Sequence, residues 1–277
     1  GFAGDENTPS GYLINGFNAG RGFSGRRDAS NIASVEVLKG PGSALYGRAE
    51  PGGTINIVTK KPSFEREGSI ELTGGSFGTK RRAADYTGPL SGNVAFRING
   101  AYEDNDSFRD YFTSKRATIT PSIIARLGSS TTLSYELEWT QQEAPFERGV
   151  VATAEGVLGV IPESRFLGEP GDGVNEVKAL GHQLVLQHDF SDRWSLLAGL
   201  GYRDSSFEGF SSDAELAAGR QPYYSGTTRN VLLGRQRRYR EYSAKDLSAR
   251  AELSGRIETG SLTHHILTGV DYYDYEL

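Results

Sequence analysis

The segment VEVLKGPGSALYGRAEPGGTINIVTKKP, residues 35–62, decides the fold of this chain. Two runs rich in β-branched residues, 35–38 and 54–59, flank a middle section crowded with glycine and proline. Glycine permits positive φ and close backbone approach, whereas proline fixes φ and ends hydrogen-bond ladders. Flexible linkers do not carry such runs on both sides. The pattern therefore predicts a strand, a compact turned segment and a second strand.

The composition favours β-structure with two differently solvated faces. Hydrophobic residues make up only 36% of the 277 residues, while glycine (36), tyrosine (14) and phenylalanine (13) are plentiful. A net charge of −5 argues against nucleic-acid binding, and the lack of cysteine excludes disulfides and cysteine-ligated metal. No apolar run of ~18 residues is present, which argues against a membrane-spanning helix. It does not argue against a membrane β-barrel, whose strands are shorter and alternate. Because methionine is absent even at position 1, we expect a targeting signal to lie upstream.

After residue 62, apolar and polar residues alternate with a period of two. In 133–139, for example, leucine, tyrosine and tryptophan occupy the odd positions, and Ser134, Glu136 and Glu138 occupy the even ones. Such alternation places an apolar row on one face of a strand and a polar row on the other. Nine strands are predicted, at 68–75, 81–89, 93–104, 115–127, 131–142, 178–190, 194–210, 236–257 and 261–275.

The connections between these strands alternate in length. Short turns are expected at 90–92, 128–130, 191–193 and 258–260, and long loops at 105–114, 143–177 and 211–235. Strands of ~10 to 20 residues exceed the usual ~5–6, and aromatic residues gather near their ends. These features favour an outer-membrane β-barrel. A soluble sandwich or lectin-like domain, whose strands also alternate, is the alternative.

The opening segment resembles the end of the plug domain of TonB-dependent outer-membrane receptors, most closely the ferric-siderophore branch. VEVLKGP, SALYGR and EPGGTINIVTKKP carry the resemblance, and GF at 1–2, YLINGF at 12–17 and IPESRFLGEPGDG at 161–173 agree with it. The resemblance implies an all-β membrane fold, a transmembrane antiparallel β-barrel with an N-terminal plug domain. The family barrel has about 22 strands, so residues 1–62 are expected to be the end of the plug and 63–277 the first part of the barrel.

The same resemblance implies a function. The protein is expected to import ferric siderophores across the Gram-negative outer membrane with energy delivered through TonB and its inner-membrane complex. Iron would be cargo inside the chelate, so no cofactor is expected; outer-membrane lipid and lipopolysaccharide are further expected partners. The loop at 161–173 leans towards a hydroxamate cargo. The alternatives are a receptor for cobalamin, haem or an oligosaccharide, a passive porin, or a soluble binding module; an enzyme ranks last, because no catalytic set stands out.

Seven residues are candidates for contact with cargo. The resemblance implies that the loop holding Arg21 and Phe23 meets the ligand, although an arginine there could instead pair with a carboxylate of the lumen. Aromatic residues in long loops and at strand ends suit a pocket for a rigid chelate, although several could simply pack loops together. These are Phe146, Phe207, Phe210, Tyr223 and Tyr224, of which Phe146, Phe207 and Phe210 are favoured because strands meet long loops there; Phe166 is a weaker candidate.

The remaining polar motifs have blander interpretations. GPGSALYG at 40–47 lacks the lysine ending of a phosphate loop, and the four histidines lie too far apart or on opposite faces for a metal site. Lys39 and Arg48 are expected to tie the plug to the barrel. The basic cluster RQRRYR at 235–240 could hold lipopolysaccharide phosphates, attract an anionic chelate, or simply be solvated. The charges of the polar face are expected to hydrate the wall or clamp the plug; they are Arg97, Glu136, Glu138, Arg250, Glu252 and Arg256.

Overall fold

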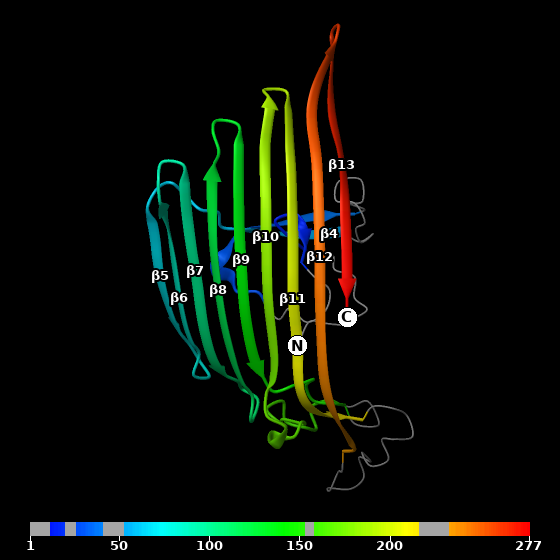
Figure 1. Ribbon diagram of the computed structural model, residues 1–277. Coiled ribbons are helices and arrows are strands. Elements are labelled where there is room, and N and C mark those ends of the chain that lie inside the picture. The colour runs from blue at the N-terminus through cyan, green and yellow to red at the C-terminus, as the bar shows by residue number, and fades with distance from the viewer. Residues whose placement is uncertain (1–11, 20–25, 41–52, 153–157, 216–232) are drawn as a thin grey trace.

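The computed structural model describes residues 12–19, 26–40, 53–152, 158–215 and 233–277, and they form two separate sheets (Figure 1). A small four-stranded sheet, the inner sheet, has the order β2-β1-β4-β3. A nine-stranded sheet, the wall, runs from β5 to β13 with every strand beside its sequence neighbour. Within the described residues, no helix is long and apolar enough to cross a membrane.

The inner sheet contains both ends of the opening segment. Its strands are β1 (Tyr12–Ile14), β2 (Phe17–Asn18), β3 (Ile32–Lys39) and β4 (Gly53–Thr59). β3 and β4 are antiparallel and paired from Lys39↔Gly53 inward, whereas β1 runs parallel to β4. Gly53 has a φ of +136°, and a Cβ added there would lie 2.5 Å from the carbonyl oxygen of Leu38, so only glycine fits. The two predicted strands are confirmed; the turned segment between them lies outside the described residues.

All nine predicted wall strands are confirmed. They are β5 (Glu67–Gly74), β6 (Lys80–Pro89), β7 (Val94–Asp106), β8 (Thr113–Arg126), β9 (Thr131–Ala144), β10 (Asn175–Ser191), β11 (Trp194–Ala214), β12 (Arg235–Thr259) and β13 (Leu262–Glu276). Neighbouring strands are antiparallel throughout. β5 and β13 are the two edges of this sheet, which is an open part of a barrel.

The two ends of the wall differ in the length of their connections. Short turns join β6 to β7, β8 to β9, β10 to β11 and β12 to β13 at the top of Figure 1, here called the turn end. The longer connections lie at the bottom, here called the loop end. This asymmetry is typical of outer-membrane barrels, in which the long loops face outward from the cell.

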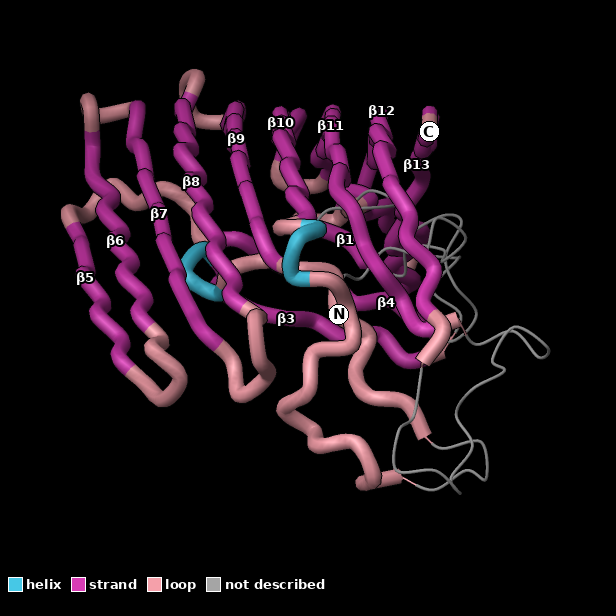
Figure 2. Tube along the Cα trace, turned by 90° about the horizontal axis from the view of Figure 1, so that it is seen from below, coloured by secondary structure: helices cyan, strands magenta, loops and turns pink. Residues whose placement is uncertain are grey.

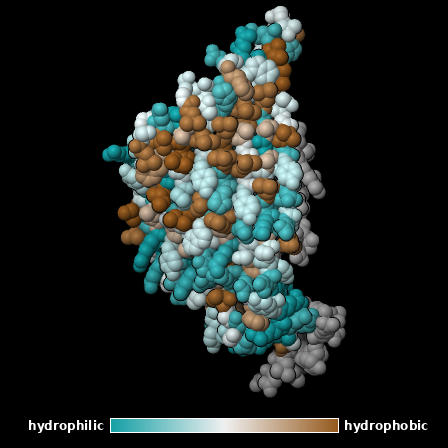
Figure 3. All heavy atoms as spheres, viewed as in Figure 1, coloured by the Kyte–Doolittle hydropathy of each residue, from teal (hydrophilic) through white to brown (hydrophobic). Residues whose placement is uncertain are grey.

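The two faces of the wall also differ. Leu200 and Leu247 point outward and are 52% and 41% exposed, so the apolar rows do not enclose a sealed core. Figure 3 shows apolar residues gathered over the upper and middle parts of this outer face, with hydrophilic residues below them towards the loop end. The buried residues of the opposite, inner face are largely polar, including Asn99, Glu136 and Glu138. An apolar outer face and a polar inner face are typical of a transmembrane barrel.

The inner sheet lies against the concave inner face of the wall (Figure 2). Ile14 and Phe17 are each only 4% exposed there. Phe17 fits because two glycines of β11 face it: a Cβ at Gly199 would lie 2.2 Å from the Phe17 ring, and one at Gly201 3.5 Å from it. The wall therefore has a recess shaped for one aromatic side chain.

Candidate ligand site and its supporting contacts

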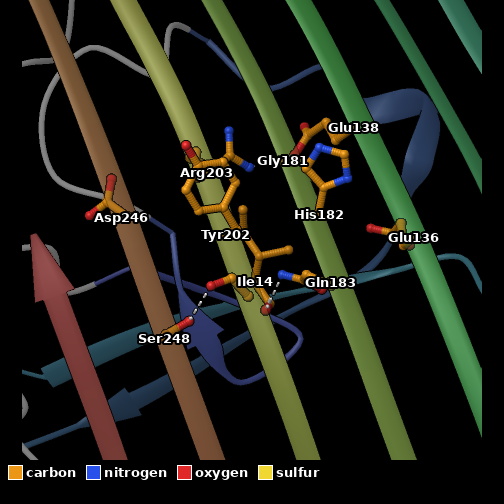
Figure 4. Close-up of a pocket in the computed structure, with 11 residues that line it drawn as sticks. Ile14, Glu136, Glu138, Gly181, His182, Gln183, Tyr202, Arg203, Asp246 and Ser248 are labelled. Carbon is orange, nitrogen blue, oxygen red and sulfur yellow. Dashed lines mark hydrogen bonds and ion pairs between the residues drawn. The ribbon is translucent and has the colours of Figure 1, made fainter.

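A buried carboxylate of β9 holds the inner sheet by charge. Glu138, 8% exposed, lies 3.0 Å from the guanidinium of Arg27, which precedes β3, and 2.7 Å from that of Arg203 on β11. One carboxylate between two guanidiniums forms a charge-assisted contact that is strong where water is scarce. Figure 4 shows Glu138 and Arg203 facing the same small cavity between inner sheet and wall.

A hydrogen-bond network lies beside this ion pair. The hydroxyl of Thr59 donates to Glu136 at 2.7 Å, and the amide of Asn15 donates to Thr59 at 2.9 Å and to Gln183 of β10 at 2.8 Å. The ammonium of Lys61 also donates to Thr59, at 3.2 Å. Burial lowers the pKa of Lys61, against the opposing attraction of Glu136. This network connects β1 and β4 of the inner sheet to the wall.

Asp28 makes the third contact between the two sheets. Its carboxylate caps the short helix η1 (Ala29–Asn31) through the backbone N–H of Ser30, and accepts from Arg81 at 2.8 Å and Arg116 at 3.2 Å. Burial alone raises the pKa of Asp28, but the hydrogen bonds from Arg81 and Ser30 outweigh it, so the pKa is lowered to about 2. The carboxylate is therefore charged at any physiological pH.

These contacts differ in part from the sequence expectation. Glu136 and Glu138 do clamp the inner sheet, but Lys39 is exposed, and Arg27 and Asp28 make the ion pairs described above. Arg48 lies outside the described residues. The sequence signal for the true anchors is the charged run RRD at 26–28, immediately before η1.

A cleft opens at the loop end of the wall, next to the inner sheet. It has a volume of about 380 Å³. Phe108, Phe112 and Pro145 supply apolar surface, while Arg26, in the segment that precedes η1, and Gln142 of β9 supply polar groups. Most of the remaining lining is polar or charged and includes Glu103, Asp106 and Glu147, so the cleft offers a few aromatic surfaces among many hydrogen-bonding groups.

An aromatic group, here called the rim cluster, adjoins this cleft. It consists of Phe146, Val177, Phe207 and Tyr242. The guanidiniums of Arg240 and Arg148 lie 4.8 and 5.2 Å from the centre of the Phe146 ring. Phe207 is only 1% exposed, so it supports the other side chains and presents no surface of its own.

Phe210 does not join the rim cluster. It lies on the outer face of the wall, 37% exposed, with its ring 4.8 Å from that of Tyr239. Side chains alternate between the faces of a strand, and Phe207 and Phe210 are an odd number of residues apart. The expectation that both serve one pocket therefore overlooked their opposite parity.

The other candidate residues have different outcomes. Arg21, Phe23, Tyr223 and Tyr224 lie outside the described residues, so their role stays a prediction. Phe166, 8% exposed, is buried in the loop between β9 and β10.

None of the four histidines belongs to a group of described residues placed to bind a metal ion. His182 and His188 are hydrogen-bonded to the hydroxyls of Tyr135 and Thr131, both at 2.8 Å. Within the described part of the chain, no group of three or more histidine or acidic residues is placed to hold a metal ion.

Comparison with known proteins agrees with this architecture. Residues 1–54 match the family model of the TonB-dependent receptor plug domain. The metal-pseudopaline receptor CntO of Pseudomonas aeruginosa is 38% identical over 260 residues, which are 93% of this chain and 35% of that protein. The ferrioxamine receptor of Yersinia enterocolitica is 27% identical over 252 residues, covering 88% of this chain and 33% of that protein.

Solved structures show the same fold. The open form of the ferric-catecholate import receptor Fiu from E. coli matches 96% of this chain and 42% of its own chain, with a TM-score of 0.85 and 22% identity. The ferripyoverdine receptor of Pseudomonas aeruginosa, bound to ferripyoverdine, matches 95% of this chain and 36% of its own, with a TM-score of 0.80 and 21% identity. This chain spans about a third of the length of the curated relatives it matches.

Proposed function

We propose that this chain, which is part of a TonB-dependent outer-membrane receptor, belongs to a transporter that binds a metal–siderophore complex at its loop end and imports it with energy delivered through TonB. In this proposal residues 1–62 are the end of the plug and 63–277 the first part of the barrel. The protein acts by binding and gating, and no catalytic step is assigned to it.

The observation that carries the proposal is the position of the cleft. It lies at the loop end, the end that in outer-membrane barrels faces the outside of the cell, and Arg26, from the segment that leads into the inner sheet, forms part of its lining. A chelate bound there touches the plug directly. Binding at the outer end therefore acts directly on the plug, which must move before cargo can pass.

The side chains of the site divide the work of recognition. Phe146, Phe108 and Phe112 offer apolar surface to the organic part of a chelate. Arg26, Arg240 and Gln142 offer N–H donors to its oxygen atoms. In the resting state the plug stays seated through Arg27, Asp28 and Thr59, whose contacts to the wall any transport step must break.

The cargo has a second candidate class. The sequence loop at 161–173 favoured a hydroxamate such as ferrioxamine, and one relative at 27% identity is named a ferrioxamine receptor. The relative at 38% identity is instead named a metal-pseudopaline receptor. A chelate of that second kind, with a metal not restricted to iron, is therefore the alternative that the higher identity favours.

Growth and binding together test the proposal. A strain lacking the full-length receptor is grown under metal limitation with one metal–chelate complex at a time, and the purified receptor is titrated with the same complexes by intrinsic fluorescence. We expect one class to support receptor-dependent growth and to bind. Failure of ferrioxamine, pyoverdine and pseudopaline complexes in both assays contradicts the proposal, and swelling of receptor-containing liposomes in small sugars would indicate a porin.

A further inference from the structure

The connection between β9 and β10 crosses the loop end of the wall and holds two other parts of the chain together. Its residues 161–173 are here called the crossing loop (Figure 1). On one side it contacts the connection between β7 and β8, where the backbone N–H of Asp110 donates to the carbonyl of Ser164 at 2.8 Å. On the other side it contacts the first residues of β12. The crossing loop therefore joins the β7–β8 connection to β12, although β9, β10 and β11 lie between them in the wall.

Two arginines of the basic cluster form the contact with β12. The guanidinium of Arg235 donates to the carbonyl of Gly168 at 2.5 Å and lies 3.0 Å from the carboxylate of Glu169. Arg237 donates to Asp172 at 2.7 Å, and the Asp172 side chain is only 4% exposed. This end of the crossing loop is therefore fixed to the wall by charge-assisted hydrogen bonds.

Arg109 forms the contact with the β7–β8 connection. Its Nη1 donates to the carbonyls of Glu163 and Arg165 at 2.6 and 3.2 Å. Its Nε lies 3.2 Å from the carboxylate of Glu147, which follows β9. The guanidinium also lies 5.2 Å from the centre of the Phe108 ring. The side chain of Arg109 is 12% exposed, so these contacts form where water is scarce and are strengthened by that environment.

Arg109 links the crossing loop to the candidate cleft without lining the cleft itself. Of the described residues, Phe108 and Glu147 line the cleft, whereas Arg109 does not. Phe108 and Glu147 belong to two different connections of the wall, and one guanidinium contacts both. Because the crossing loop is fixed to β12 at its far end, it gives Arg109 a firm support from which to hold these two side chains in place.

The polar contacts carry much of this attachment because packing beneath the crossing loop is incomplete. A cavity of about 720 Å³ lies between the crossing loop, the β7–β8 connection and the start of β12. Its lining includes Tyr111, Phe166 and Leu233. Tyr111 is 73% exposed, so its ring does not pack the β7–β8 connection tightly against its neighbours. Loss of the Arg109 contacts would therefore leave little apolar contact to keep that connection in position.

We propose that Arg109 is a positioning residue for chelate binding, which holds Phe108 and Glu147 in the binding arrangement before cargo arrives. The inference rests on the proposed function, since it concerns the cleft that is assigned there to the chelate. A site formed in advance binds without the cost of ordering its walls. When only a fraction of the molecules has the formed site, the apparent affinity falls by that fraction. Loss of Arg109 therefore slows association and leaves the dissociation rate of bound cargo unchanged.

Binding rates test this role on the full-length receptor in detergent. Ferrioxamine, pyoverdine and pseudopaline complexes are each mixed with the wild type and with Arg109→Gln, and intrinsic fluorescence is followed by stopped flow. The variant is expected to associate about tenfold more slowly with the complex that the wild type binds, at an unchanged dissociation rate. Arg193→Gln is the matched control, because it removes a 54% exposed arginine at the turn end whose ion pair is 3.7 Å long. It is expected to bind as the wild type does.

A reversible cross-link separates positioning from misfolding. This chain has no cysteine, and the backbone hydrogen bond between Asp110 and Ser164 places these two residues side by side, as a disulfide requires. Asp110→Cys with Ser164→Cys is introduced into Arg109→Gln. The oxidised form is expected to recover the wild-type association rate, and reduction is expected to remove that recovery. If Arg109 instead contacted the cargo directly, the cross-link would not restore binding.

Hydrogen exchange without cargo gives a second readout. Arg109→Gln is expected to speed the exchange of backbone amides at 107–112, and the oxidised cross-link is expected to slow it again. Faster dissociation in Arg109→Gln, a wild-type association rate in that variant, or a cross-link that restores nothing overturns the proposal. If the wild type binds none of the three complexes, the proposed function fails instead. In that case unchanged exchange in Arg109→Gln still overturns the positioning role, and faster exchange supports it.

Discussion

Phe17 of the inner sheet fits against Gly199 of the wall so closely that a Cβ at residue 199 would lie 2.2 Å from the phenylalanine Cζ. Gly199→Ala is therefore expected to displace the plug and to lower the free energy of unfolding by about 1–3 kcal/mol. The unfolding midpoint of the full-length receptor in denaturant measures this. Gly74→Ala is the control, because no described atom lies within 4 Å of a Cβ at that position. Equal midpoints for the two variants would show that the recess is not needed.

Glu138→Gln is expected to loosen the plug, because it leaves Arg27 and Arg203 without their shared carboxylate. Breaking a buried ion pair from one side costs about 3 kcal/mol. Faster hydrogen exchange in β3 and β4 is the expected readout. In the control Glu258→Gln, the removed carboxylate is 47% exposed and its pairs are 3.5 and 3.7 Å long, so little change is expected. Unaltered exchange in Glu138→Gln would rule out the clamp.

Acid is expected to weaken the contact made by Asp28. Its pKa falls from an ordinary 3.8 to about 2 on folding, so the ionised carboxylate stabilises the folded state above about pH 4. That contribution is lost as the pH falls from about 4 towards 2. Denaturant midpoints measured from pH 6 to pH 2 test this. The Asp28→Asn variant, which has no carboxylate to protonate, should show a smaller decline; parallel curves would contradict the assignment.

Replacement of the three favoured phenylalanines should give three different results. Phe146→Ala is expected to weaken chelate binding by about 1–2 kcal/mol, since the ring lies in the rim cluster beneath two arginines. Phe207→Ala removes a side chain that is only 1% exposed, and should cost about 3 kcal/mol of stability as well. Phe210→Ala, on the outer face, should leave chelate affinity unchanged. Fluorescence titration with the cargo complex and thermal unfolding separate these outcomes, and a loss of chelate affinity in Phe210→Ala would contradict the placement.

The strands were predictable because each wall residue meets one of two different solvents. Leu247 and Glu252 point to opposite faces, and the alternation of apolar and polar residues along the sequence shows this contrast directly. The same rule predicts that Phe210 lies on the outer face, because it is three residues after the inward-facing Phe207. Strand parity is thus a stronger guide to a barrel pocket than proximity to a loop.

The anchoring of the plug was less predictable because its partners are distant in sequence. Thr59 and Glu136 are 77 residues apart, and Asn15 and Gln183 are 168 apart. A single sequence contains no signal that pairs one polar residue with another over such distances. Gly199 shows the same difficulty. A glycine in a strand indicates that another group packs closely against the backbone, but it does not identify that group as the Phe17 side chain.

The seat of the plug consists largely of hydroxyls, amides and charges. Water can replace each of these hydrogen-bond and ion-pair partners when the plug leaves the wall. Withdrawal therefore exposes little apolar surface that could associate non-specifically. In the proposed transport cycle, this seat therefore lets the plug leave the wall and bind it again without exposing a large apolar surface.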